Sequence, residues 1–266
     1  MTSKADVDHA RLARLLEVAW QTRRPVPPLT EARGLATLED AYLIQSEWAA
    51  LRQAAGDTIR GRKISLTSRV AQEQMGVDEP DFGNLWASRH VPVVSGRASV
   101  PADWFLQPRI EAEFAFLLGS SLPEGQVTGE DVLAATEAVA PAFEIVDSRI
   151  EDWRIAIQDT VADNASFGAF VVADWESGLD PASLDTVLMT ITQNGKGVAE
   201  GAGTGALGQP ANAVAWLVNR LRSFGTELLP GDTVLSGSVA RMIPAASGDS
   251  FGIEIGGRDA LSVTFS

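Results

Sequence analysis

The sequence predicts an α+β fold in which a mostly β core with peripheral helices follows a helical N-terminal region. Residues 5–23 and 37–56 carry apolar side chains at the spacing of amphipathic helices. From about residue 58 onward the spacing changes to one that is typical of strands. Asn194-Gly195 and Gly256-Gly257 are turn signals of the kind that joins antiparallel strands into hairpins.

The sequence also indicates where the individual helices and strands lie. The second N-terminal helix opens with Thr37-Leu38-Glu39-Asp40, which is similar to a capping box. Further helices are expected over 128–139 and 211–224. Strands are expected near residues 58–65, 109–118, 141–147, 167–173, 185–193, 233–238, 251–255 and 260–265. We therefore divide the chain into a helical N-terminal region, 1–57, and a β-rich domain, 58–266.

Composition excludes several classes of protein. The chain has 266 residues, a formal net charge of −14 and no cysteine. Without a basic surplus, neither nucleic acid nor an anionic membrane is expected as a partner. The absence of cysteine excludes disulfides, thiolate catalysis and thiolate metal ligands. The first residues lack the apolar core of a signal peptide and no apolar run reaches membrane-spanning length, so we expect a cytoplasmic protein.

Two carboxylates alternate with apolar residues in the run from Arg109 to Leu118. The period of two predicts a strand on which Glu111 and Glu113 share one face, with Cα atoms about 6–7 Å apart. Glu144 adds a third carboxylate in another apolar run, where a lone charge needs a partner. Such oxygen ligands indicate a hard cation, Mg²⁺ or Mn²⁺. The alternative is a half-solvated strand whose polar residues face water.

Three other segments carry candidate chemistry. Lys63 follows Arg62 and is flanked by apolar residues, so it is either a partly desolvated proton donor or acceptor or a snorkelling surface lysine. Asp81 lies in a turn-rich acidic loop and is either a general base or a helix cap. The small, polar segment 159–168, which includes Ser166, either presents amides and hydroxyls to an anion or forms a structural turn.

Five longer motifs occur in a fixed order along the chain. They are GRKISLT at 61–67, GVDEPDFG at 76–83, QPRIEAE at 107–113, FEIVDSRIEDW at 143–153 and DTVADNAS at 159–166. Together they resemble the 2-keto-4-pentenoate (2-hydroxypenta-2,4-dienoate) hydratases of the fumarylacetoacetate hydrolase superfamily. The resemblance covers nearly the whole chain. Ser65 stands where a glycine is expected and Phe167 where a small residue or cysteine is common, and both departures bear on substrate identity.

The resemblance implies a fold and a set of site residues. The fold is a mixed β-sheet roll or sandwich of the fumarylacetoacetate hydrolase C-terminal type, preceded by the helical region. The site has metal ligands, acid and base groups and substrate contacts. In this chain these are Glu111, Glu113 and Glu144 for the metal, Lys63 and Asp81 for proton transfer, and Ser166 and Arg62 for the substrate.

The resemblance also implies a reaction. We expect a Mg²⁺- or Mn²⁺-dependent hydratase (a hydro-lyase) that adds water to a 2-hydroxydienoate in aromatic meta-cleavage catabolism. Its apolar tail pocket is expected around Phe82, Leu85 and Phe167. The alternative in the same superfamily is a 2-oxo-3-enedioate (4-oxalocrotonate) decarboxylase, which needs a further cation at the far end of the pocket. A non-catalytic partner subunit is a third hypothesis.

Partners follow from the same reasoning. The expected ligand is a small 2-hydroxydienoate or 2-oxo acid. A homo-oligomer is expected, because seven tryptophans and several long apolar strands exceed what peripheral helices cover. A complex with another enzyme of the pathway is a further hypothesis.

Overall fold

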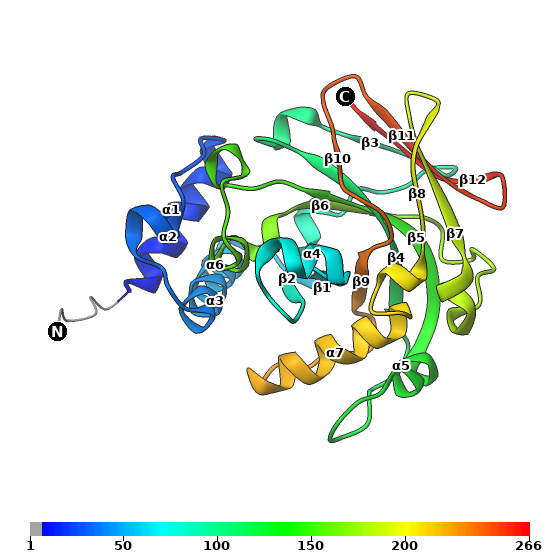
Figure 1. The fold of residues 1–266 in the computed structure, drawn as a ribbon, viewed down its shortest axis with the longest axis horizontal. Coiled ribbons are helices and arrows are strands. Elements are labelled where there is room, and N and C mark those ends of the chain that lie inside the picture. Colours follow the sequence, from blue (N-terminus) through cyan, green and yellow to red (C-terminus); the bar gives the residue numbers. More distant parts are fainter. Residues whose placement is uncertain (1–6) are drawn as a thin grey trace.

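Two β-sheets and a set of surrounding helices make up the fold, as the computed structural model in Figure 1 shows. The structure describes residues 7–266. The helices are α1 (His9–Thr22), α2 (Leu29–Arg33), α3 (Leu38–Ala54), α4 (Arg69–Met75), α5 (Gly129–Ala135), α6 (Ile157–Ala162) and α7 (Pro210–Ser223). The strands are β1 (Ile59–Ser65), β2 (Asp81–Trp86), β3 (Arg97–Val100), β4 (Arg109–Leu118), β5 (Thr136–Val146), β6 (Phe167–Val172), β7 (Leu188–Gln193), β8 (Lys196–Ala202), β9 (Thr233–Ser238), β10 (Ile243–Pro244), β11 (Ser250–Ile255) and β12 (Arg258–Phe265).

The larger sheet rolls until its two edges touch. Its strand order is β2-β1-β9-β4-β5-β6, and β10 pairs with β4. A parallel bridge joins His90, just after β2, to Phe170 on β6. The amide of Asn84 donates to the side-chain oxygen of Asn164 at 2.7 Å, directly before β6. Such closure leaves few unpaired backbone groups at the edges and creates an enclosed concave face.

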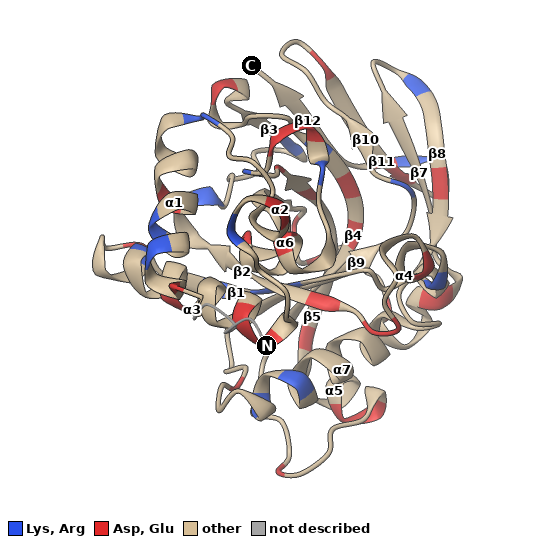
Figure 2. Ribbon diagram, turned by 60° about the vertical axis from the view of Figure 1, so that its left-hand side comes forward, with Lys and Arg blue, Asp and Glu red and all other residues tan. Residues whose placement is uncertain are grey.

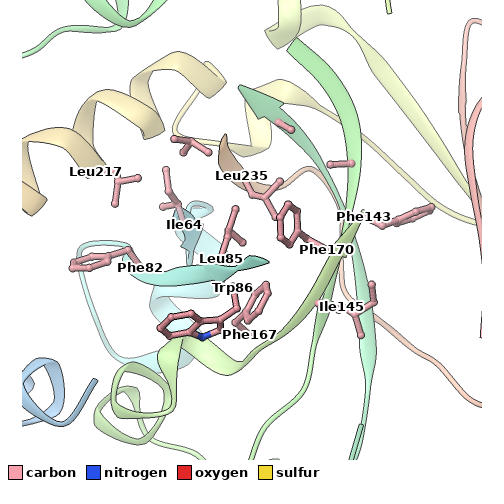
Figure 3. Close-up of a cluster of buried hydrophobic side chains, with 14 of the residues drawn as sticks. Ile64, Phe82, Leu85, Trp86, Phe143, Ile145, Phe167, Phe170, Leu217 and Leu235 are labelled. Atoms are coloured by element: carbon pink, nitrogen blue, oxygen red, sulfur yellow. The ribbon is translucent and has the colours of Figure 1, made fainter. Parts of the chain in front are cut away.

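Core packing differs on the two faces of the roll. Figure 3 shows Leu85, Phe170 and Leu235 gathered inside the roll, whereas Phe143 and Ile145 point to the other side of β5. The smaller sheet, in the order β3-β12-β11-β7-β8, supplies its own apolar face, and Phe251 and Phe265 contact each other at a centroid distance of 5.8 Å. All these side chains are buried.

Helices α1 to α3 are attached to the roll by buried polar contacts. The side-chain amide of Gln45 on α3 donates to the carbonyls of Phe82 at 2.9 Å and Val161 at 2.8 Å. Asp159 in the first turn of α6 accepts a hydrogen bond from the backbone N–H of Leu29 at 2.7 Å. Leu29 is the first residue of α2, so this bond attaches the start of α2 to α6. These bonds fix β2 and α6, which flank the candidate site. The division of the chain at residue 57 into two domains stays a prediction.

Several local expectations are confirmed. Thr37 caps α3 by accepting the Asp40 N–H at 3.1 Å. Asn194 and Gly195 have φ of 52° and 75° and join β7 to β8, because a two-residue hairpin turn of this type needs left-handed residues. Gly256 and Gly257 join β11 to β12 in the same way. The first two residues of the helix expected over 5–23 lie outside the described residues.

Two expectations were wrong. The helix expected over 128–139 ends at Ala135, because the residues from Thr136 onward pair with β4, and pairing with a neighbouring strand overrides weak local helix preference. The segment around Asp81 is not a loop: Asp81 begins β2 and lies opposite Ser65 of β1. That pairing turns the Asp81 side chain to the face of the sheet that also carries Lys63.

The close contact between β2 and the turn before β6 gives a test of the fold. A Cβ on Gly83 would lie 2.4 Å from the carbonyl oxygen of Asn164, so Gly83→Ala should lower the free energy of unfolding by about 1–3 kcal/mol. Urea unfolding followed by circular dichroism measures this. Gly197→Ala is the control, because a Cβ on Gly197 meets nothing within 4 Å. Equal midpoints for the two variants would contradict the described contact.

Candidate active site

Three glutamates meet on the concave face of the roll. Glu111 on β4 pairs directly with Glu144 on β5, and Glu113 follows two residues along β4 on the same face. One carboxylate oxygen from each lies within 4.8 Å of the others, and among the described residues this is the one cluster of three potential ligands. Figure 2 shows the acidic positions along β4. The sequence predicts all three as ligands, Glu111 and Glu113 from their spacing and Glu144 from its apolar surroundings, and the pairing of β4 with β5 brings them together.

The cluster lacks the donors that ionised carboxylates need. Glu113 and Glu144 are fully buried, while Glu111 is partly exposed to a cavity. The Gly237 N–H donates to one oxygen of Glu113 at 2.7 Å, while its other oxygen accepts no hydrogen bond from the described residues, and Glu144 is met by the Lys63 ammonium at one oxygen, 3.1 Å away. Three carboxylates so placed need protons or a cation, and their all-oxygen donor set fits a hard divalent cation.

Burial raises the pKa of all three carboxyl groups, and repulsion from a neighbouring carboxylate adds to the rise. Burial, followed by the charge of Glu144, raises the pKa of Glu111 to about 7. The same two causes raise the pKa of Glu113 well above its usual range. For Glu144, burial raises the pKa while the Lys63 ammonium opposes the rise. Protons and a metal ion therefore compete for these oxygens.

Lys63 brings the one buried ammonium to this cluster. Its Nζ lies 3.1 Å from a Glu144 oxygen and also donates to the Ser65 hydroxyl. Burial lowers the pKa of Lys63, but the charges of Glu144 and then Asp81 outweigh it, so the net pKa is raised and the amine stays protonated. Lys63 is fully buried, so it is not the snorkelling surface lysine that the sequence alone also allowed.

Asp81 lies behind Lys63 and Ser65. Its side chain is 2% exposed, and burial raises the pKa of its carboxyl group although the Lys63 ammonium opposes the rise. The register that pairs Asp81 with Ser65 places it on the same face as Lys63. The site thus holds a second carboxyl group that is coupled electrostatically to the ammonium.

A tight turn before β6 positions Ser166. Asn164, Ala165 and Ser166 all have left-handed backbone, with φ of 54°, 51° and 53°. The buried guanidinium of Arg149 holds this turn by donating to the Asp163 carboxylate at 2.5 Å and to the Phe167 carbonyl at 2.6 Å. The Ser166 hydroxyl is buried and has no hydrogen-bond partner among the described residues. Strain of this kind typically accompanies functional positions.

A cavity of about 550 Å³ opens beside these groups. Its lining includes the site residues Lys63, Ser65, Glu111 and Ser166. Most of the remaining wall is apolar and comes from α4, from the segment before α6 and from residues 239–242. Such a pocket, apolar with a few convergent polar groups, is the usual form of a small-molecule site.

Arg62 does not reach this cavity. Successive residues of β1 point to opposite faces, so Arg62 turns away from the face that carries Lys63. Its guanidinium donates to the Gly61 carbonyl at 3.0 Å and faces Asp232. The geometry therefore gives no support to Arg62 as a substrate contact.

The three side chains that were expected to form the tail pocket do not line this cavity either. Phe82 stacks on Tyr42 at a centroid distance of 4.8 Å, and Leu85 and Phe167 are fully buried in the core (Figure 3). These side chains shape the roll and do not line the cavity. The residues that do line its apolar part include Val70, Met75 and Trp153, which sequence reasoning missed. Trp153 lies within one of the five motifs, and α4 carries no buried residue that would mark it.

The sequence of this chain matches a known protein family and is similar to characterised enzymes. Residues 60–265 match the family described as fumarylacetoacetate (FAA) hydrolase C-terminal. The chain is 47% identical over 255 residues to the 2-hydroxyhexa-2,4-dienoate hydratase of Comamonas testosteroni, with 95% of each chain covered. It is 40% identical over 255 residues to the 2-keto-4-pentenoate hydratase of Paraburkholderia xenovorans (strain LB400), covering 95% of this chain and 93% of that one.

A solved structure is similar over almost the whole length. The 4-oxalocrotonate decarboxylase from Pseudomonas putida G7, complexed with magnesium and adipate, matches with a TM-score of 0.90 at 30% identity, and the match covers 99% of both chains.

Within residues 7–266, none of the helices has both the length and the apolar character that a membrane crossing requires.

The raised pKa of Glu111 predicts that divalent cation binding depends on pH. Below about pH 7 the free site carries a proton on Glu111 that an arriving cation must displace, so the affinity should fall as the pH is lowered. Each proton displaced costs up to tenfold in apparent affinity per pH unit. Titration calorimetry with Mn²⁺ at pH 6 and pH 8 measures the effect. Equal affinity at both values would contradict the proton competition.

Proposed function

Because the chain belongs to the fumarylacetoacetate hydrolase family, we propose that it is a hydratase, a lyase that adds water to 2-hydroxypenta-2,4-dienoate (2-keto-4-pentenoate) in aromatic meta-cleavage catabolism. The product is 4-hydroxy-2-oxopentanoate. The observation that carries the proposal is the carboxylate cluster beside Lys63, which meets a mostly apolar cavity through Glu111 and Lys63. The two relatives named above are both hydratases of dienoates of this kind.

The charged and polar groups of the cavity wall suit the head of such a substrate. A divalent cation, Mg²⁺ or Mn²⁺, held by Glu111, Glu113 and Glu144 would act as a Lewis acid that stabilises negative charge on the substrate's C2 oxygen. We assign the hydroxyl of Ser166, which has no hydrogen-bond partner among the described residues, to donate to the substrate carboxylate. The Lys63 ammonium adds the positive charge that an anion needs near an acidic protein.

Proton transfer falls to Lys63 and Asp81. In the first half of the reaction C5 gains a proton and the enol oxygen loses one, which gives the conjugated 2-oxo-3-enoate. Lys63 holds a proton at Nζ on the cavity wall, so we assign it to protonate C5. Asp81 lies behind it and is assigned to exchange protons with Lys63. In the second half water forms a bond to C4 and a proton goes to C3.

A decarboxylase acting on a 2-oxo-3-enedioate is the second candidate. The solved structure with a TM-score of 0.90 is a 4-oxalocrotonate decarboxylase, and Arg241 lines the cavity described here. A second substrate carboxylate would need a cation of this kind. The Arg241 guanidinium, however, donates to the Val198 carbonyl at 3.1 Å, and the surrounding wall is mainly apolar. We therefore rank hydration first.

A product assay separates the two candidates. The purified protein with Mg²⁺ should convert 2-hydroxypenta-2,4-dienoate to 4-hydroxy-2-oxopentanoate, because Lys63 and Ser166 in the cavity wall suit the single carboxylate of this substrate. Mass spectrometry detects the gain of water, and an assay with the 2-oxo-3-enedioate 4-oxalocrotonate detects the release of CO₂. Faster release of CO₂ from the enedioate than hydration of the dienoate would make the decarboxylase the correct assignment.

Turnover should depend on an amine at position 63. Lys63→Met removes the transferable proton but keeps much of the side-chain volume, so kcat for hydration should fall about 10²-fold or more. Lys63→Arg should not restore it, because a guanidinium is effectively never deprotonated. Metal content and circular dichroism report whether each variant is folded and loaded. Lys196→Ala, at an exposed lysine on β8, is the control, and near-normal kcat for Lys63→Met would exclude the assigned role.

A further inference from the structure

Ser65 lies between the two groups that the proposed reaction uses for proton transfer. Its hydroxyl accepts a hydrogen bond from the Lys63 ammonium. Across the sheet Ser65 is paired directly with Asp81, and the β-carbons of such a pair are about 4.5–5.5 Å apart. Lys63 is diagonal to Asp81 in the same register, and diagonal neighbours are about 7–8 Å apart. The Ser65 side chain therefore connects Lys63 to Asp81.

Two partners hold the Lys63 ammonium. A Glu144 oxygen lies 3.1 Å from Nζ, and the Ser65 hydroxyl accepts a second N–H. An ammonium has three N–H groups, so one remains, and Lys63 lines the cavity that a substrate enters. The lysine stem is flexible, and with Glu144 as its nearest partner Nζ would follow the attraction of that carboxylate. Because Ser65 also lines the cavity, its bond holds Nζ at the cavity wall.

Asp81 in turn orients the Ser65 hydroxyl. A hydroxyl that accepts a hydrogen bond from an ammonium keeps its own proton free to donate. Asp81 is 2% exposed, and its oxygens accept no well-aligned hydrogen bond from the described residues. Burial raises the pKa of this carboxyl group, and the Lys63 ammonium and then the Ser65 hydroxyl oppose the rise. The buried carboxyl group is thus the acceptor toward which the Ser65 proton turns.

We propose that Ser65 is a positioning residue: its hydroxyl, oriented by Asp81, keeps the Lys63 ammonium at the point of the cavity wall from which C5 of the substrate is protonated. The inference rests on the proposed hydratase function and adds a residue to its machinery. In that step the Nζ–H bond breaks and the C5–H bond forms, and Ser65 exchanges no atom with the substrate. Ser65 stands where the motif resemblance predicts a glycine, so the hydroxyl is a departure of this chain from that motif.

Variants at position 65 separate the hydroxyl from the space that it fills. In Ser65→Ala the remaining β-carbon keeps a water molecule out of the hydroxyl position, so kcat for hydration should fall about 10- to 100-fold while KM changes less than about twofold. Ser65→Thr keeps the hydroxyl and should restore kcat. Ser65→Gly makes room for a water molecule and should lie between the two. Ser99→Ala, at an exposed position on β3, is the control.

The solvent isotope effect on kcat distinguishes positioning from a loss of folded enzyme. If Ser65→Ala slows proton transfer from Nζ, this step limits turnover more strongly, and the ratio of kcat in H₂O to kcat in D₂O should rise above the wild-type ratio. Ser65→Thr should return the ratio to the wild-type value. A variant that only reduces the amount of active protein lowers kcat in both solvents by the same factor. Circular dichroism and bound Mn²⁺ report whether each variant is folded and loaded.

The outcomes separate the role of Ser65 from the function itself. Near-normal kcat in Ser65→Ala overturns the inference, and so does a lowered kcat with an unchanged isotope ratio. A raised KM at unchanged kcat also overturns it, because the hydroxyl would then contact the substrate and not position Lys63. All three results leave the hydratase function standing. If the wild-type protein hydrates no 2-hydroxydienoate with Mg²⁺ or Mn²⁺ present, the proposed function fails, and the inference fails with it.

Discussion

The attraction between one buried ammonium and three clustered carboxylates, two of them fully buried, is the constraint on which the site depends. Lys63 supplies the buried positive charge to Glu111, Glu113 and Glu144, and Arg109 has a smaller effect on Glu111, so the cluster keeps an excess of acidic groups. Isolated ionised groups are costly to bury, and they persist only where protons or a cation offset the repulsion. The pKa values of the three carboxyl groups are raised because the groups are removed from water and lie beside other carboxylates.

The rolled sheet holds these charges together. Lys63 comes from β1, while the glutamates come from β4 and β5, and β9 lies between them in the sheet. Closure of the roll through the His90–Phe170 bridge fixes the distance between its two ends. The buried Arg149–Asp163 pair then holds the turn that carries Ser166. Removing one partner of such a pair typically costs about 3–5 kcal/mol, so the turn is strongly determined by its surroundings.

Sequence reasoning reached the parts of the site that rest on local periodicity. Glu111 and Glu113 follow from alternation along one strand, but their position opposite Glu144 depends on the β4–β5 register, which spacing does not determine. The roles of Lys63, Asp81 and Ser166 came from the family resemblance. Strand β2 was missed because glycine, asparagine and aspartate are typical of turns, and here sheet pairing overrides that preference. The apolar cavity wall is assembled from distant segments, so no single window of sequence shows it.

The central claim is that the three glutamates hold one divalent cation beside Lys63. Anomalous diffraction from a crystal soaked in Mn²⁺ tests it most directly, because the signal locates the ion independently of any assumed chemistry. The account predicts one strong peak per chain within bonding distance of oxygens from Glu111, Glu113 and Glu144. A fully bound ion at other residues, with these three carboxylates uncoordinated, would contradict it.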